Sequence, residues 1–553
     1  MGTFGSFTTV RLGIYSAQKG LDVTGNNITN INTEGYTRQR LNQVSLVPSV
    51  TDRYASSYKN RIGQGAVITT ITQLRDPGLD ISYRKATSDV GSANAKLTGL
   101  NDLATILDEV GKGDLEQDDG VILSQLNDIR DLISQAIASG GSSTYDALIR
   151  SSAESLTTHF NSYADKLSAL QKTYEDKFDQ QVTQINDYLT QIRDLNVAIR
   201  NSDLRGDPGL ELRDNRNKLL DELSQYVKID VKYTMDTIGP DTQVEKLTVS
   251  IASELGHEHV LVDGEYSATL KQGDAADGYG ITVSGLTDVD GEPHPTITDA
   301  DIRLQEGDLY GSLQSIRDLL TGKGEFATQA EIDADPDAAV TRGIPYYQKA
   351  LDSLAYEFAT AMNELNHVYD QNGNLVEGAG NLFSIGSDTN DAVSYVTPGD
   401  PTSGIAERIT ASNISVSKAW TSQQVSIQAK GSASAPSGDT SQLAKFLDLF
   451  SKEMDFDPKH VDTDAVGDSY HGTFEGMLLK IQSTLAEDQM STDSVLNNYT
   501  VTADDIYVDR EGVVGVDLND EATSLMTYQK AYTAACRLMT TLEEALDSLI
   551  NAT

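Results

Sequence analysis

The chain has 553 residues, 38% of them hydrophobic, so it is long enough for several domains with apolar cores. Its 83 acidic and 42 basic residues give a net charge of -41, which argues against binding to nucleic acid or to anionic membranes. A single cysteine, Cys536, cannot form an internal disulfide. The sequence contains neither an apolar run of the roughly 20 residues that span a bilayer nor, near its start, the continuous apolar core of a cleaved signal peptide.

The N-terminal segment carries a helical heptad pattern, in which apolar or small residues step alternately by three and four. These positions are Phe7, Val10, Ile14, Ala17, Leu21, Thr24, Ile28 and Ile31. Such spacing puts them on one narrow seam of a helix, as in coiled coils. The helix is expected to end in the segment 25–36, where asparagines compete for backbone hydrogen bonds and a glycine can take a positive φ. The residues of this turn motif are Asn26, Asn27, Asn30, Asn32 and Gly35.

Long helices are expected after an irregular and extended segment at 41–75. Their predicted ranges are 79–109, 121–139, about 145–201 and 210–226. The third has a seam of large apolar residues and would be on the order of 80 Å long, which indicates a rod-like bundle. The acidic loop 108–119 lacks the spacing of an EF-hand and is interpreted as solvated, although the sequence leaves open whether it binds a cation.

The apolar period changes from helical to alternating near residue 229. Segment 229–300 is predicted to be a small β excursion, with a turn at Asp263-Gly264. Helices are expected again at 308–320, 345–368 and about 474–486, and a closing helix begins near Asn519. The intervening segment 371–470 is mixed and strand-rich, and we interpret it as a variable β-rich outer domain.

The closing helix repeats the heptad pattern of the first. Its seam consists of Leu525, Tyr528, Tyr532, Ala535, Met539, Leu542, Leu546 and Leu549. Because neither terminal segment can bury its stripe alone, we expect the two to pair. The alternative is that both are ordinary amphipathic helices packed on a globular core.

The predicted fold class is therefore mainly α with β insertions (α+β). It comprises paired terminal coiled-coil helices, a long helical-bundle rod and a β-rich outer domain. The predicted domains are nested: 1–36 with 518–553 form the terminal coiled coil, and 37–370 with 471–517 form the rod that carries the β excursion. Segment 371–470 forms the outer domain.

No catalytic, metal or cofactor motif is recognised in the sequence. His257-Glu258-His259 lacks the HExxH spacing, because Leu261 stands where the second histidine would be, and the pair is interpreted as surface residues. With only seven histidines and no phosphate-binding glycine loop, the chain is predicted not to be an enzyme. An enzyme hidden in the β excursion stays as an alternative.

Residues 17–39 resemble the N-terminal signature shared by flagellar rod, hook and hook-associated proteins. The resemblance rests on the asparagine-rich turn motif followed by Gly35-Tyr36; Glu34 stands where the family usually has proline. The ending Arg38-Gln39 resembles the hook-associated branch. Further stretches that resemble this branch are 212–224, 351–367, 515–522 and the tyrosine motif 528–532, whereas 386–470 matches weakly.

The resemblance implies a structural protein of the flagellar hook–filament junction, located outside the cell and exported through the flagellar channel without a cleaved signal peptide. It implies a homo-oligomeric ring zone in which the terminal helices line the channel, the rod forms the next shell and the β region faces solvent. The implied partners are the hook protein, a second junction protein next to the filament, and an export chaperone. The expected chaperone contacts are Leu525, Tyr532, Met539, Leu542 and Leu546. The alternatives are a hook or distal-rod protein of the same assembly, and an adhesin carried on the outer domain.

Overall fold

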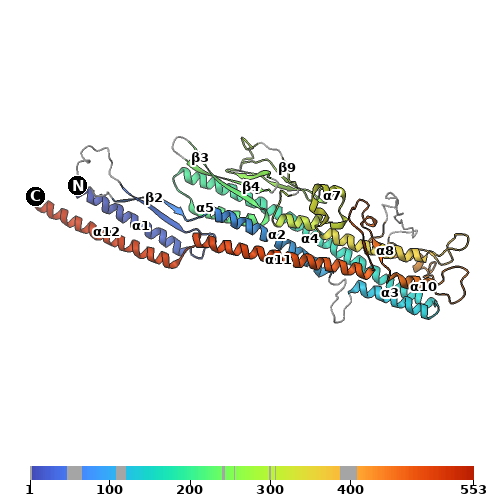
Figure 1. The fold of residues 1–553 in the computed structure, drawn as a ribbon. Coiled ribbons are helices and arrows are strands. Elements are labelled where there is room, and N and C mark those ends of the chain that lie inside the picture. Colours follow the sequence, from blue (N-terminus) through green and yellow to red (C-terminus); the bar gives the residue numbers. More distant parts are fainter. Residues whose placement is uncertain are drawn as a thin grey trace.

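The computed structural model describes residues 3–46, 65–107, 120–238, 243–253, 256–297, 301–305, 307–386 and 408–552. The molecule is elongated, and both ends of the chain lie together at one end of it (Figure 1). Helix α1 (Thr3–Thr29) and the closing helix α12 (Leu518–Ala552) lie side by side there. The strands β1 (Gln39–Ser45) and β2 (Ala66–Gln73) form an antiparallel hairpin on α1. The predicted acidic loop 108–119 falls outside the described residues.

The rod is a bundle around α4 (Ser143–Leu204), a helix of 62 residues. At 1.5 Å per residue it is about 90 Å long. The predicted seam is buried along nearly its whole length, since apolar side chains recur every three or four residues and meet neighbouring helices on one face. The helices around it are α2 (Pro77–Leu107), α3 (Val121–Ala138), α5 (Leu210–Tyr226), α6 (Ser312–Thr321), α8 (Ile344–Asn366) and α11 (Phe474–Val514). All the predicted rod helices are confirmed to within a few residues, except α11.

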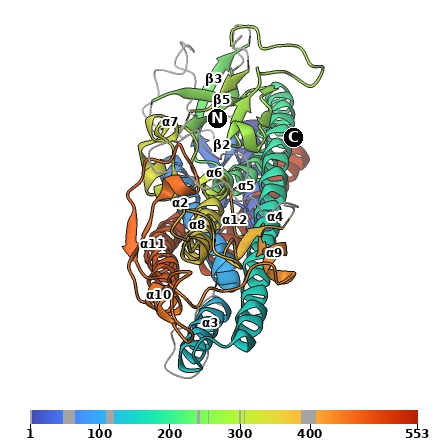
Figure 2. The same ribbon diagram turned by 90° about the vertical axis from the view of Figure 1, so that its right-hand side faces the viewer.

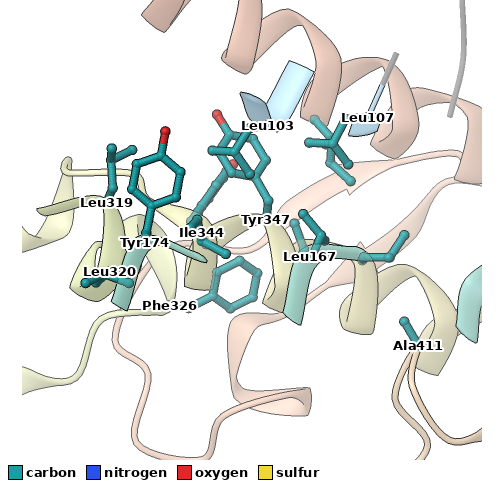
Figure 3. Packing of buried hydrophobic residues seen from close by; sticks show 14 of the residues in the cluster. Leu103, Leu107, Leu167, Tyr174, Leu319, Leu320, Phe326, Ile344, Tyr347 and Ala411 are labelled. Atoms are coloured by element: carbon teal, nitrogen blue, oxygen red, sulfur yellow. The ribbon is translucent and has the colours of Figure 1, made fainter. Parts of the chain in front are cut away.

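The core of the rod lies where helices from distant parts of the sequence meet. Figure 3 shows Leu103 of α2 and Leu167 of α4 close to Tyr347 of α8, beside Leu319 of α6. Each of these four side chains is at most 2% exposed. Viewed end-on in Figure 2, the helices form a bundle, and the green strands of the β excursion lie on one side of it.

Helix α11 is much longer than predicted. The sequence indicated helix only to about residue 486, but the helix continues to Val514. Its second half is rich in aspartate, asparagine and β-branched residues, which have low helix propensity, and it buries only Thr492, Arg510 and Val514. It packs along α2 on one side, so tertiary contact rather than an apolar stripe holds it.

The β excursion forms two small antiparallel sheets. The first has the order β3-β4-β5-β6, from Ile229–Thr237, Gln243–Ala252, Glu258–Asp263 and Tyr266–Ser267. The predicted turn lies between β5 and β6, where Gly264 has φ +62°. The second sheet has the order β7-β8-β9, from Leu270–Gln272, Ile281–Val283 and Ile302–Arg303, so the excursion runs slightly past the predicted end at 300.

Segment 371–470 has less strand in its described part than the sequence indicated. Two pairs of three-residue strands are present: β10 (Phe383–Ile385) with β11 (Ile414–Val416), and β12 (Met454–Phe456) with β13 (Tyr470–Gly472). The same segment contains helices α9 (Lys418–Thr421) and α10 (Ser441–Leu449). A further short helix, α7 (Gln329–Ala334), lies earlier in the chain, before α8. The segment packs onto the rod: the buried Trp420 donates its indole N–H to Asp146 of α4, at 2.9 Å.

Candidate functional site

The terminal helices form an antiparallel pair that uses most of the predicted seam. On α1, Val10 is buried, and Phe7, Ile14, Leu21 and Ile28 are half-buried. The half-buried seam residues on α12 are Leu525, Tyr528, Met539, Leu542 and Leu546. Two predicted seam residues, Tyr532 and Leu549, are instead 37% and 58% exposed. They lie in the same heptad pattern, but a pair of single helices covers only a narrow strip of each partner.

The two helices are in tight contact at Gly20. A methyl group at this position would have its carbon 2.4 Å from Cδ1 and 2.7 Å from Cγ of Tyr528. The tyrosine ring therefore lies directly on the glycine backbone, and only a residue without a side chain permits this contact. Gly20 was not among the predicted seam residues, because the heptad pattern was read from apolar side chains.

The other side of α1 packs on the β1–β2 hairpin. Ser16 donates a hydrogen bond from Oγ to Oε1 of Gln43, at 2.6 Å, and Val23 and Leu41 are buried. Helix α1 therefore has two covered faces, which explains why Ser16 and Val23 are buried although neither belongs to the predicted seam. This contact could not be predicted from the sequence, because the segment that forms the hairpin was expected only to be irregular and extended.

Asn27 holds the turn that follows α1. It is 1% exposed, and its amide Nδ2 donates to the backbone oxygen of Gln39, at 2.9 Å. Its Oδ1 accepts from the backbone N–H of Gln39, at 3.0 Å, and from the hydroxyl of Tyr36, at 2.8 Å. Burial and nearby carboxylates raise the pKa of Tyr36, so the phenol stays protonated as this donor. Asn27 thus pairs with both the backbone N–H and the backbone oxygen of Gln39, the first residue of β1, as a neighbouring strand would.

The other predicted turn residues have smaller roles. Asn30 donates to the backbone oxygen and to Oδ1 of Asn26, at 3.0 and 2.9 Å. Gly35 has φ +78° and faces the side chain of Lys218 on α5. Asn32 is exposed. The motif therefore acts mainly through Asn27, with Asn26, Asn30 and Gly35 shaping the turn.

Residues after the turn connect it to the last two helices. The backbone N–H of Arg38 donates to the backbone oxygen of Val514, at the end of α11, at 2.9 Å. Its guanidinium donates to Glu521 in the first turn of α12, at 2.7 Å, and Glu521 is 2% exposed. A buried carboxylate needs such a partner, because removal from water strongly disfavours a lone charge.

A network of buried ion pairs continues from this turn into the rod. Arg510 of α11 donates to Asp80 of α2 at 2.8 Å and to Asp221 of α5 at 2.6 Å. Arg84 of α2 also donates to Asp221, at 2.8 Å. Arg75 donates to Asp80 from two nitrogens, at 2.6 and 3.1 Å. These pairs fix α2, α5 and α11 relative to one another. We call the turn motif, Arg38, Glu521 and this network the joint.

The carboxylates of the joint titrate differently. Burial alone would raise the pKa of Asp80, but the hydrogen bond and charge of Arg75, with the charges of Arg510 and Arg84, hold it below its ordinary value. Burial raises the pKa of Asp214 on α5 to about 6, although a hydrogen bond from Thr37 and the charge of Arg75 act in the opposite direction. Of these two carboxylates, only that of Asp80 is held firmly in its charged form.

Three stretches that are far apart in the sequence meet in the joint. They are the turn motif with Tyr36 and Arg38, the α5 stretch 212–224 and the stretch 515–522 at the start of α12. These are stretches that carried the family resemblance. The basic partners Arg75, Arg84 and Arg510 were missed, since each stands alone in the sequence among ordinary polar residues.

The histidine pair of the β excursion lies beside an acidic residue that the sequence did not connect with it. Among the described residues, His257, His259 and Asp308 form a group in which one possible ligand atom from each residue lies within 4.8 Å of the others, which is close enough to hold a metal ion. Burial would raise the pKa of Asp308, but hydrogen bonds from Ser253, Gln305 and His257 lower it below its ordinary value. The sequence indicated that both histidines are surface residues, but the side chain of His259 is only 11% exposed.

No helix in the described part of the chain is both long and apolar enough to cross a membrane.

Family models match three parts of the chain. The model for the helical domain of the flagellar hook-associated protein FlgK matches residues 114–383. The C-terminal model of flagellar basal body rod FlgEFG proteins matches residues 513–552, and the flagella basal body rod protein model matches residues 15–37. The two outer matches fall on the terminal helices, and the central one covers most of the rod and the β excursion.

Individual proteins give the same result over nearly the whole chain. The chain is 25% identical over 561 residues to flagellar hook-associated protein 1 of Bacillus subtilis (strain 168), which covers 99% of this chain and 98% of the relative. The fold is similar to that of the flagellar hook junction protein FlgK from Burkholderia pseudomallei, with a TM-score of 0.52 and 13% identity over 78% of this chain and 100% of that chain. Together these matches support the assignment of the chain to the FlgK type of flagellar hook-associated proteins and a structural role in the bacterial flagellum.

Proposed function

We propose that this chain forms the hook–filament junction, where copies of it assemble through their terminal helices and α11. The observation that carries the proposal is that large apolar side chains are left exposed on these helices, and that those on α11 form a row along one face, because they are 11 and 7 residues apart. On α11, Met490, Val501 and Val508 are 73%, 62% and 66% exposed. On α12, Met526 and Leu538 are 53% and 51% exposed. Exposed apolar rows of this kind usually mark protein contacts.

The occupant of this row is a further copy of the chain. A ring of identical subunits presents the same surface repeatedly, and α12 follows α11 after the three residues 515–517, so the rod and the terminal pair can both face a neighbouring copy. The joint supports this arrangement, because its buried ion pairs keep the terminal pair at a fixed angle to the rod. The proposed partners above and below the ring are the hook protein and a second junction protein next to the filament.

We extend the proposal to the domains predicted from the sequence. We propose that the terminal pair, formed by 1–36 with 518–553, is the inner assembly unit. The rod, 37–370 with 471–517, would form the next shell, and the β excursion with 371–470 would face solvent. No step in this proposal requires catalysis, and we infer that the protein acts without enzymatic activity.

We further propose that an export chaperone holds α12 before assembly. Four of the five expected contacts, Leu525, Met539, Leu542 and Leu546, are half-buried against α1 in the folded chain, and Tyr532 is partly exposed beside them. A chaperone on this face would therefore replace α1. Binding of the chaperone and pairing of α1 with α12 would exclude each other, and the chain would reach the flagellar channel with its ends unpaired.

Electron microscopy of cells that lack the gene tests the junction role. We expect bare hooks on the cells and free flagellin in the culture medium, both restored by the intact gene. Cells without hooks would place the protein in the rod or hook instead. Normal filaments would overturn the proposal.

A further inference from the structure

We propose that His257, His259 and Asp308 form a binding site for a divalent transition-metal ion of the zinc type. The two histidines flank Glu258 at the start of β5, and Asp308 lies in the loop between β9 and α6. Alternate residues of an extended chain point to the same side, so both imidazoles reach the same place. The side chain of Glu258 instead pairs with Lys232, at 2.6 Å.

The distances between the ligand atoms suit a tetrahedral ion. Two ligands bonded to zinc at about 2.0–2.1 Å with a tetrahedral angle between them lie about 3.3 Å apart. The distance from His257 Nδ1 to Asp308 Oδ1 is 3.0 Å, and that from His259 Nε2 to Asp308 Oδ2 is 3.4 Å. The two histidine nitrogens are within 4.8 Å of each other, so a small movement of the exposed His257 would complete the set.

His259 provides an independent sign that a ligand belongs here. Its Nε2 atom is buried and makes no hydrogen bond within the described structure, although Asp308 lies 3.4 Å away. A buried polar atom without a hydrogen bond is costly. A metal ion between Nε2 and the carboxylate would satisfy the nitrogen lone pair.

The surroundings of Asp308 match the support that metal-binding carboxylates receive. Its side chain is 0% exposed. Its Oδ1 accepts from the hydroxyl of Ser253 at 2.6 Å, and its Oδ2 accepts from the backbone N–H of Gln305 at 2.8 Å. Such outer hydrogen bonds fix the orientation of a ligand, and Oδ2 keeps a lone pair for the ion. His257 would give up its hydrogen bond to Oδ1 and bind the ion through Nδ1.

The ligand set, two imidazoles and one carboxylate, determines which kind of metal ion would bind. Nitrogen ligands favour zinc and its neighbours over magnesium and calcium, which prefer oxygen ligands. The fourth position would be open to solvent on the side of His257, whose side chain is 45% exposed. An ion here would tie the start of β5 to the loop that leads into α6, so it would join the first sheet of the β excursion to the rod.

Titration calorimetry of the full chain with zinc chloride tests the site. Millimolar magnesium is included, because a chain with a net charge of -41 collects cations on its acidic surface. We expect about one zinc ion per chain, and at least a tenfold loss of affinity in His259→Gln and His257→Gln. Cobalt(II) should give the visible spectrum of a four-coordinate site in the parent but not in these variants.

His471→Gln is the matched control, since His471 is exposed and has an acidic neighbour, Asp455, at 3.5 Å. It should bind zinc like the parent. Circular dichroism confirms that each variant is folded, and the exposed position of His257 makes His257→Gln the variant least able to disturb the fold. The proposal is overturned if the parent shows no saturable zinc binding over magnesium, or if both histidine variants bind zinc as tightly as the parent.

Discussion

The replacement of Gly20 by alanine tests the pairing of the terminal helices. The added carbon would lie 2.4–2.7 Å from three ring atoms of Tyr528. One of them is Cγ, which lies on the axis about which the ring rotates. Rotation of the ring about the Cβ–Cγ bond therefore does not remove the clash, so either Tyr528 must leave its rotamer or α1 must move away from α12. Overpacking of this kind costs about 1–3 kcal/mol.

Alanine also favours the helix itself, by about 1 kcal/mol relative to glycine. Gly13→Ala provides the matched control for this gain, because Gly13 lies in the same helix and a methyl group there would meet no atom within 4 Å. The gain is common to both variants, so the difference between them isolates the clash. We expect the α1–α12 pair to be less stable in Gly20→Ala than in Gly13→Ala by about 1–3 kcal/mol.

Hydrogen–deuterium exchange of peptides from α1 measures this difference in the isolated chain. A difference of 1–3 kcal/mol corresponds to amide exchange that is about 5- to 150-fold faster in Gly20→Ala than in Gly13→Ala. Peptides from α4, in the middle of the rod, should exchange equally in both. Equal or slower exchange of α1 in Gly20→Ala would show that Tyr528 does not pack on this glycine.

Three further predictions concern the joint and α12. Asp214→Asn should alter the pH dependence of stability: the folded pKa of about 6 exceeds the ordinary 3.8, so the parent loses stability as the pH rises between these values. The free energy of unfolding of the variant, relative to the parent, should rise by about 2.4 kcal/mol from pH 4 to pH 7; an unchanged difference would contradict the burial argument. Arg510→Met removes one of the two arginine partners of Asp80 and of Asp221, which keep Arg75 and Arg84, and should cost up to about 3–5 kcal/mol in thermal unfolding, whereas Arg130→Met, at an exposed pair, should cost less than about 1 kcal/mol. Leu542→Asp combined with Leu546→Asp should abolish binding of the export chaperone in a pull-down, and retained binding would place the contact elsewhere.

The sequence predicted the parts of the fold that depend on repeated apolar residues. Helix α5 begins and ends at the predicted residues, and α4 extends only a few residues beyond them, because their buried faces have a regular spacing. The turn motif was likewise identified, since asparagine and glycine act through their own local backbone. The predicted end of helix α11 was too early, because the second half of this helix has little apolar periodicity and depends on contact with α2.

The joint could be predicted only in part. Its acidic and turn residues lie in stretches that resemble a known family, but the arginines that pair with them come from separate helices. Asp80 and Arg510, for example, are 430 positions apart, and nothing in the local sequence marks them as partners. The same limit applies to the histidine pair, whose acidic neighbour lies in a different loop. The contact of Gly20 with Tyr528 was missed because a glycine adds nothing to an apolar pattern.

Electron cryo-microscopy of isolated hook–filament junctions tests the central claim most directly. We expect a ring of copies of this chain between hook and filament, with α1 and α12 of each copy paired on the inside. The exposed residues of α11, such as Met490 and Val508, should lie against the next copy. A ring in which the terminal helices lie on the outside, or in which α11 faces only solvent, would contradict it.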